Sequence, residues 1–439
     1  MVKIKKAKTA KRIKIILEEG KEDLVSYGGG LLIDEFIHRL GLPELIDGIV
    51  HVKERERGFR ESEAILGLVI SMITGGVCLD DLFVLREEKA FKDIWRHGDI
   101  PHPTTMGDFL RRFNMGHIRQ LEGVITRAFH KVYSSGERMK TITMDIDSTL
   151  DEVFGTKRQG AHWAYTGIRA LNPLMCFIRE NGDWLHSRLR SGNTYTSDGA
   201  VSFIRESYHK IKDFADTINV CMDSGFYDKE IVAECERLGI GFSITADQTA
   251  PLMRAVQALP EDSWTKIDGR VWVSELTYLP VKWPRQYRYV VRREEMPSGG
   301  QLTLLDNSVY RYHVIVTNRM EPAAELVPFH LQRATIENFI KETKYGLSLD
   351  RFPCQEFHAN WACLTIGMLA YNIVNWLKRL ALPSMYKKKL LKALRYRFFN
   401  VAARVVRHGR YVTLRLAQGI HRFNDILYAY QRILSLQFQ

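Results

Sequence analysis

Three acidic residues stand where elements far apart in the chain would bring them together. Asp147 ends an alternating, strand-like segment over 141–149, and Asp223 follows a second hydrophobic segment. Glu337 lies within a predicted helix over 330–344. The predicted order of elements is β-β-β-α-β-α-β, followed after an interruption by that helix. In this order the two strands are neighbours with their carboxyl ends together, so we expect the three carboxylates to converge.

Three carboxylates that lie close together can bind divalent metal ions. Three of them would repel one another unless a divalent cation is bound, and a set of oxygen ligands selects Mg²⁺ or Mn²⁺. Two such ions about 4 Å apart activate a water or a sugar 3′-hydroxyl and stabilise the leaving oxygen of a phosphodiester. Asp145, two residues before Asp147 on the same face of its strand, is the alternative first carboxylate.

The predicted helix over 330–344 carries charge on one side. Arg333, Glu337 and Lys344 are spaced i, i+4 and i+11, which places them on one face of a helix. The opposite face is apolar, with Ile336, Phe339 and Ile340. Such a helix can serve metal and phosphate together, although ion pairs on a solvated face produce the same pattern.

The net charge of +12 is concentrated at the two ends of the chain. Residues 1–15 hold seven Lys and Arg and no acid, and residues 378–422 hold thirteen and again no acid. Because neutralising phosphates releases counterions, this placement favours contact with a polyanion such as nucleic acid. A basic tail can also be merely solvated, but the C-terminal segment interleaves apolar with basic residues, which indicates folded structure.

The chain is long enough for several domains. Its hydrophobic period changes from helical to strand-like near residue 140. We therefore expect a multidomain α/β protein. Its parts are a helical, DNA-binding region with a basic arm at 1–135, two halves of a catalytic domain at 140–250 and 326–376, a β-rich insertion at 251–325, and a basic region for DNA contact or dimerisation at 377–439.

Several residues outside the carboxylate site are weaker candidates for DNA contact. A short predicted helix entered through Pro101, with a Thr N-cap and two terminal arginines, has the pattern of the second helix of a helix-turn-helix. Trp283 in the insertion is a candidate for stacking on a base, and filling the insertion's own core is the alternative. The full set is Thr104, Thr105, Arg111, Arg112, Trp283 and Arg410.

Composition excludes several classes of protein. No apolar run approaches the roughly 18 residues of a membrane span, and the basic N-terminus lacks the apolar segment of a signal peptide. We therefore expect a cytoplasmic protein without membrane contact. The six cysteines are scattered without a CxxC pair, so neither a zinc site nor a disulfide framework is indicated. A two-carboxylate glycosidase fits neither the basic ends nor the Arg-Glu-Lys helix.

With these motifs the chain resembles the DDE transposases of the RNase H-like superfamily. Within them it is similar to the bacterial insertion-sequence enzymes whose third motif is Tyr-x2-Arg-x3-Glu-x6-Lys. Arg333, Glu337 and Lys344 match three of the four positions at the right spacing. His330 stands at the tyrosine position, where an imidazole would have to donate to phosphate in place of the phenol.

The first two motifs of the family are matched as well. Asp147-Ser-Thr149 matches Asp-x-Thr, and Asp223 matches the Asp that follows a hydrophobic strand. The resemblance spans about residues 140–375. It implies an RNase H-like catalytic core, a mixed five-stranded sheet with flanking helices, interrupted by a β-rich insertion and joined to helical N-terminal and C-terminal regions.

The resemblance also implies an activity and its partners. The enzyme would hydrolyse phosphodiesters at transposon ends and transfer the 3′-hydroxyl into target DNA. Its partner would be double-stranded DNA, the terminal inverted repeats and the target, bound by a homodimer on paired ends within the nucleoid. Asp147, Asp223 and Glu337 would bind two Mg²⁺ or Mn²⁺ ions, and the phosphates would be bound by His330, Arg333 and Lys344. A nuclease of the same superfamily without strand transfer, or a transposase-derived DNA-binding protein without catalysis, are the alternatives.

Overall fold

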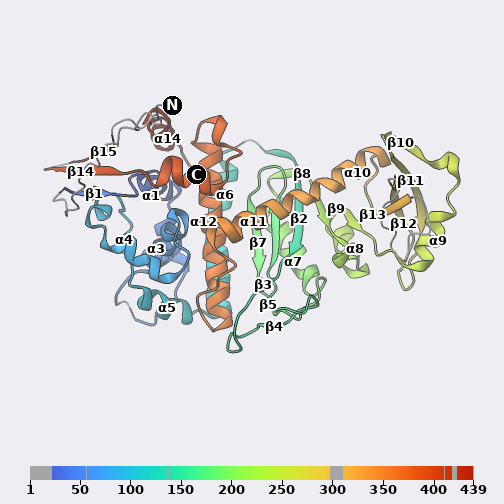
Figure 1. The fold of residues 1–439 in the computed structure, drawn as a ribbon, viewed down its shortest axis with the longest axis horizontal. Coiled ribbons are helices and arrows are strands. Elements are labelled where there is room, and N and C mark those ends of the chain that lie inside the picture. The colour runs from blue at the N-terminus through green and yellow to red at the C-terminus, as the bar shows by residue number, and fades with distance from the viewer. Residues whose placement is uncertain are drawn as a thin grey trace, which may run out of the picture.

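The computed structural model shows an elongated α/β protein with a strand-rich end, a central sheet and a helical end (Figure 1). Arg410, one of the predicted DNA contacts, lies outside the residues that the structure describes. The described residues are 22–55, 57–136, 138–296, 310–409, 411–417 and 423–438.

The middle of the molecule is a mixed β-sheet that contains all five predicted strands. Strands β2 and β8 run parallel, β9 runs parallel to β8, and β6 and β7 add antiparallel strands on the other side of β2. Apolar side chains on both faces of β6 are buried, which explains its continuous hydrophobic run. The five strands are β2 (Met139–Ser148), β6 (Leu174–Ile178), β7 (Trp184–Arg188), β8 (Ala215–Met222) and β9 (Gly241–Thr245).

The predicted insertion is rich in strands, but it is not a separate sheet. Its last strand pairs antiparallel with β9, with Ile315 opposite Thr245, so the central sheet continues through it to nine strands. Val314, Ile315 and Val316 are fully buried, because this strand covers the edge that β9 would otherwise leave open. The predicted number of strands in the sheet, five, was therefore too low. The added elements are α9 (Ala250–Gln257), β10 (Thr265–Asp268), β11 (Val271–Tyr278), β12 (Tyr287–Glu295) and β13 (Tyr310–Thr317).

A long apolar helix, α12 (Phe357–Leu380), lies between the sheet and the N-terminal helices (Figure 1). It packs on β7 on one side and on α3 and α6 on the other, so it is buried nearly all round. No single helix among the described residues is long and apolar enough to span a membrane, and one pair, Glu61–Thr74 with Leu79–Glu87, passes that test only together and bent by 95°. The N-terminal helices are α1 (Gly30–Leu40), α2 (Leu42–Ile49), α3 (Glu61–Thr74), α4 (Leu82–Glu87), α5 (Pro103–Arg111) and α6 (Met115–Ser134).

The C-terminal region returns to the helical end of the molecule. Its hairpin of β14 (Ala403–His408) and β15 (Tyr411–Leu416) pairs with β1 (Leu24–Val25), and α14 (Phe423–Ser435) packs on α1. The glycine turn before α1 permits this junction, because a Cβ on Gly29 would lie 1.5 Å from the Phe398 carbonyl oxygen. The basic C-terminal segment, for which we predicted folded structure, forms a single helical turn at α13 (Leu391–Leu394) followed by a π-helical turn, Arg395–Phe399.

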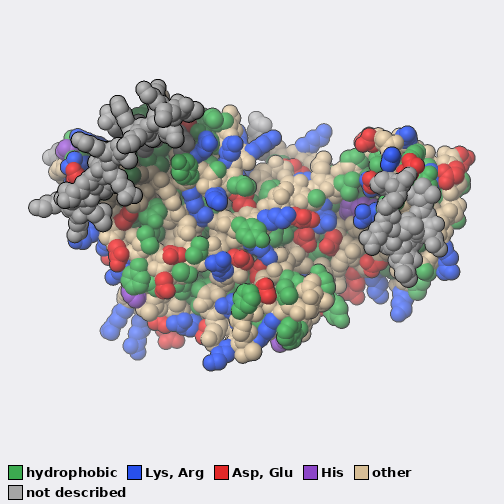
Figure 2. All heavy atoms as spheres, viewed as in Figure 1, with side chains coloured by type: hydrophobic (Ala, Val, Ile, Leu, Met, Phe, Trp, Pro, Cys, Tyr) green, Lys and Arg blue, Asp and Glu red, His purple; other side chains and the backbone are tan. Residues whose placement is uncertain are grey.

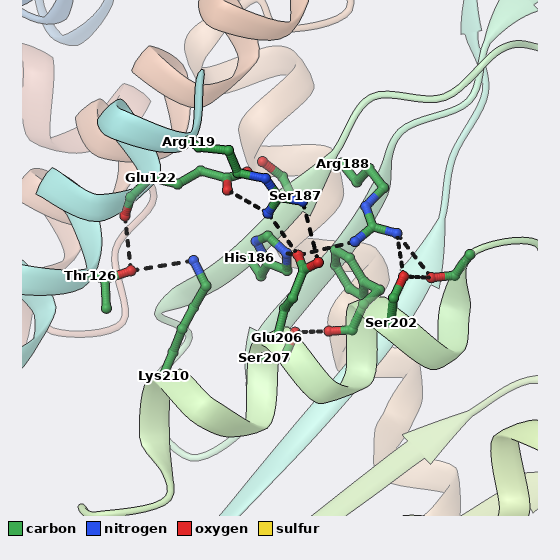
Figure 3. Close-up of polar contacts among 12 residues, drawn as sticks. Arg119, Glu122, Thr126, His186, Ser187, Arg188, Ser202, Glu206, Ser207 and Lys210 are labelled. Carbon is green, nitrogen blue, oxygen red and sulfur yellow. Dashed lines mark hydrogen bonds and ion pairs between the residues drawn. The ribbon is translucent and has the colours of Figure 1, made fainter. Parts of the chain in front are cut away.

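One charged cluster fastens the helical end to the sheet (Figure 3). Glu206, on α7 (Ala200–Ile211), accepts hydrogen bonds from His186 and Arg188 on β7 and from Arg119 on α6. These four residues, which we call the Glu206 cluster, join elements that lie up to 87 residues apart in sequence.

Candidate active site

Two of the predicted carboxylates lie at the carboxyl ends of adjacent parallel strands, at the same edge of the sheet. In the register of β2 and β8, Asp145 stands opposite Cys221. Two residues further along each strand come Asp147 and Asp223. Parallel strands end together at one edge, so the topology brings these two side chains side by side although 76 positions separate them in the sequence.

The helix that carries Glu337 crosses the same region. It begins as α10 (Ala323–Leu331), tightens into a 3₁₀ turn, and continues in line as α11 (Thr335–Leu347) (Figure 1). Ile336 and Ile340 are buried and Phe339 lies 5.4 Å from the ring of Phe177. The apolar face of the helix thus packs inward as expected, and Glu337 lies in its first turn on the other face.

Asp147 is largely buried, beside one cation and two further carboxylates. Its side chain is only 16% exposed, and Arg333 Nη1 lies 3.4 Å from its Oδ2. Burial raises the pKa of Asp147 to about 6, with further increases from the charges of Asp223 and Glu337, while Arg333 offsets part of this. Among the described residues Asp147 therefore has one paired cation, Arg333, and two carboxylate neighbours that oppose its ionisation.

The donors fit a hard divalent cation in their chemistry, because all three offer carboxylate oxygens. They do not form a closed cage: among the described residues no group of three His, Cys, Asp or Glu side chains is arranged to hold a metal ion. The side chain of Glu337 is 55% exposed, and its Oε2 is 3.8 Å from Lys341 Nζ.

Asp145, the alternative first carboxylate, is already neutralised. It is fully buried, and Arg179 Nε donates to its Oδ2 at 2.9 Å while Nη2 donates to Oδ1. A buried carboxylate held in this bidentate pair has no free oxygen face for another cation. The geometry therefore favours Asp147 over Asp145 as the first carboxylate.

The predicted phosphate contact of His330 is wrong for this structure. His330 is 2% exposed, and its ring nitrogens bond to Ser243 Oγ at 2.7 Å and Thr245 Oγ1 at 2.9 Å. Burial lowers its pKa to about 3, with further lowering by the charges of His313 and Arg333, so the imidazole is neutral. His330 fixes α10 to β9 and offers no surface to a phosphate.

The predicted phosphate contact of Lys344 is not supported either. Its ammonium lies 2.8 Å from Asp151 Oδ1 and donates to the Leu150 carbonyl oxygen at 2.8 Å. Asp151 is buried, so Lys344 compensates an internal carboxylate just beyond β2. The sequence analysis did not identify Asp151, because the residues around it give no sign that it pairs with Lys344, 193 positions later.

The short helix proposed for DNA contact is present as α5, with a different cap. His102 Nδ1 accepts from the backbone N–H of Thr104 at 3.2 Å, so the N-cap is His102 and the helix begins at Pro103. The side chains that were predicted to touch DNA are all exposed, namely Thr104, Thr105, Arg111 and Arg112. Their contact with DNA remains a prediction.

Trp283 lies closer to the carboxylates than its sequence position suggests. It is half-buried and stacks on Tyr227 with ring centroids 5.0 Å apart. Tyr227 follows Asp223 by four residues, and its hydroxyl shares a hydrogen bond of 2.7 Å with Tyr289. The tryptophan thus braces the loop after β8, which accords with the packing role that we weighed for it against base stacking.

Comparison with known proteins addresses the family directly. The model of the family described as Transposase DDE domain group 1 matches residues 6–437. No curated protein matches the chain. Among solved structures, a piggyBac transposase synaptic complex with hairpin DNA is 11% identical, with 84% of this chain and 79% of that chain covered and a TM-score of 0.44. Because the family model spans almost the whole chain, the protein belongs to the group 1 DDE-domain transposases.

Proposed function

We propose that the protein is a divalent-metal-dependent DNA transposase of the insertion-sequence type. It hydrolyses phosphodiesters at the ends of its element and transfers the freed 3′-hydroxyl into target DNA, with two copies holding paired ends in the nucleoid. The observation that carries the proposal is the juxtaposition of Asp147 and Asp223 at the ends of β2 and β8, with the helix of Glu337 across them. Membership of a transposase family supports it.

In this proposal Asp147 and Asp223 hold two Mg²⁺ or Mn²⁺ ions, and Glu337 completes the second site. When bound, these ions supply an activated nucleophile and stabilise the leaving oxygen. The protein's own contribution is a pair of carboxylates at adjacent strand ends, in which the charge of Asp223 helps to raise the pKa of the largely buried Asp147; a bound cation would relieve this repulsion.

Arg333 has a second task in the same scheme. It is 21% exposed and pairs with Asp147 at 3.4 Å, longer than a tight charged hydrogen bond. Asp147, if it held a cation, would attract the guanidinium of Arg333 less strongly. Arg333 is then available to a phosphate oxygen beside the scissile bond, where a fork of N–H donors suits both substrate and transition state.

The test compares two aspartates in one loop. Asp223→Asn should abolish Mn²⁺-dependent cleavage of a plasmid that carries the gene with its native flanking DNA, while DNA binding is retained. Asp228→Asn is the matched control, because Asp228 caps α8 (Lys229–Arg237) by accepting from Glu230 N, and Asn caps a helix as well as Asp does. Cleavage retained in Asp223→Asn would refute the proposal, and cleavage without strand transfer would identify a nuclease instead.

A further inference from the structure

A second concave surface lies on the flank of α11 that faces away from Asp147. It encloses about 930 Å³ between α11, the turn joining β6 to β7, the C-terminal end of α12 and the segment 387–392. We call it the α11 groove. Figure 2 shows Lys and Arg side chains gathered in the upper middle of this face, near where α11 meets α12 in Figure 1.

The α11 groove is strongly cationic. Eight Lys and Arg line it against two acids, a formal balance of +6. Both acids are engaged with backbone: Glu180 accepts from Thr143 N at 2.9 Å and Glu342 accepts from Leu391 N at 2.8 Å. Four of the cations are exposed lysines that have no acidic partner within ion-pair distance in the described part of the chain, namely Lys387, Lys388, Lys389 and Lys392.

The lysine segment is fastened to the helix that carries Glu337. The hydrogen bond from Leu391 N to Glu342 attaches it to the middle of α11, and Arg395 donates to the carbonyl oxygen of Gly346 near the end of α11. A Cβ on Gly346 would lie 3.8 Å from the Leu391 side chain, so the two segments are in direct contact. The backbone that carries the lysines is therefore held against α11.

Side chains on the exposed face of α11 lie between the carboxylate site and the α11 groove. Lys341 lines the α11 groove and also has its ammonium 3.8 Å from Glu337. Tyr345 follows one turn later, lines the groove, and is 79% exposed. Cationic and aromatic groups thus continue from the edge of the carboxylate site into the groove, the pattern that follows a nucleic-acid strand.

We infer that the α11 groove binds the phosphodiester backbone of DNA that passes over α11 from the scissile bond. The inference rests on the proposed function and extends it to a second contact on the opposite flank of the catalytic helix. Lysines are mobile point charges, so they bind successive phosphates without reading sequence. The groove accordingly contributes affinity and direction to the DNA, and base specificity arises elsewhere.

The test measures binding of a fluorescent DNA duplex of random sequence as a function of salt. The variant K387Q/K388Q/K389Q removes three charges from the groove. The matched control K140Q/K212Q/K229Q removes three exposed lysines that do not line the groove and changes the net charge equally. Each phosphate contact contributes about 0.9 to the slope of log Kobs against log salt concentration, so loss of three should reduce its magnitude by about 2–3.

The outcomes separate this inference from the proposed function. A smaller slope in the groove variant and an unchanged slope in the control would support the inference. Equal slopes in both variants, with wild-type binding and Mn²⁺-dependent cleavage intact, would overturn the inference and leave the proposed function standing. A wild-type protein that neither binds nor cuts DNA would overturn both.

Discussion

The carboxylate site and the Glu206 cluster use the same kinds of side chain in opposite proportions. In the Glu206 cluster one carboxylate accepts from three donors, His186 at 2.9 Å, Arg188 at 3.0 Å and Arg119 at 3.0 Å (Figure 3). At the other site one guanidinium, that of Arg333, lies 3.4 Å from Asp147, and the charges of Asp223 and Glu337 oppose the ionisation of Asp147. The carboxylate of Glu206 thus has several donors within the protein, whereas Asp147 has one paired guanidinium and two carboxylate neighbours.

The pKa values follow this difference. Burial alone would raise the pKa of Glu206, but hydrogen bonds from His186 and Arg119 outweigh it and hold that pKa well below its usual range. Burial and neighbouring carboxylates raise the pKa of Asp147 to about 6. A satisfied cluster stabilises the fold, whereas an unsatisfied one costs stability and marks a place where a ligand supplies what the protein omits.

The largest expected effect is on DNA cleavage, which should respond to a substitution in the carboxylate site and not to one in the Glu206 cluster. Asp147→Asn should reduce Mn²⁺-dependent DNA cleavage by about 10³-fold or more, because a charged metal ligand is lost and metal catalysis contributes several kcal/mol. Glu206→Gln should leave the rate per folded molecule within about threefold of wild type, since it contacts no reacting group. Single-turnover cleavage measures both, and equal losses would remove the functional distinction.

The free energy of unfolding should fall after a substitution in the Glu206 cluster and not after one at Asp147. Glu206→Gln should lower the free energy of unfolding by about 2–3 kcal/mol at neutral pH, because charged hydrogen bonds to three donors are weakened. Denaturant titration measures this, with Glu152→Gln, an exposed residue of β3 (Asp151–Glu152), as the control. The folded pKa of Glu206 is depressed, so its contribution is fully present above the unfolded value of 4.5 and is lost as the pH falls. An unchanged midpoint for Glu206→Gln would contradict the anchoring role.

Asp147→Asn should instead stabilise the metal-free protein. The folded pKa of Asp147 is raised from 3.8 to about 6, so ionisation is costly in the folded state and stability falls as the pH rises from about 4 to 6. At pH 7 the variant should gain about 1–2 kcal/mol, and at pH 3.5 the gain should vanish. Denaturant titrations in chelator at both pH values measure this, and a loss of stability at pH 7 would mean that the Arg333 pair dominates.

The smallest effect is the response to metal. Mn²⁺ at ten times its dissociation constant should stabilise the wild type by about 1.4 kcal/mol, because it binds the folded state alone. Asp147→Asn should show little of this, and Glu206→Gln should show all of it. Thermal unfolding with and without Mn²⁺ measures the increments, which would be equal in all three proteins if the cation bound elsewhere.

Local pattern alone determined much of the scaffold. Alternation predicted β2 and β8 to within about two residues, and the period of three to four predicted α11 with Ile336 and Ile340 inward. Asp147 and Asp223 were identifiable because each ends a hydrophobic strand, and parallel strands place such ends together. These features depend on backbone hydrogen bonding and side-chain direction, which repeat along the chain and are therefore visible in it.

Only the tertiary structure decided which charged groups are free. His330 stands at the tyrosine position of the motif, yet it is buried and bonds to Ser243, 87 positions earlier. Lys344 lies on the predicted face of the helix, yet it forms an ion pair with Asp151. The α11 groove exists because the segment 387–392 returns to α11. Whether a polar group is exposed, paired or buried depends on partners brought by long-range packing, and periodicity carries no information about them.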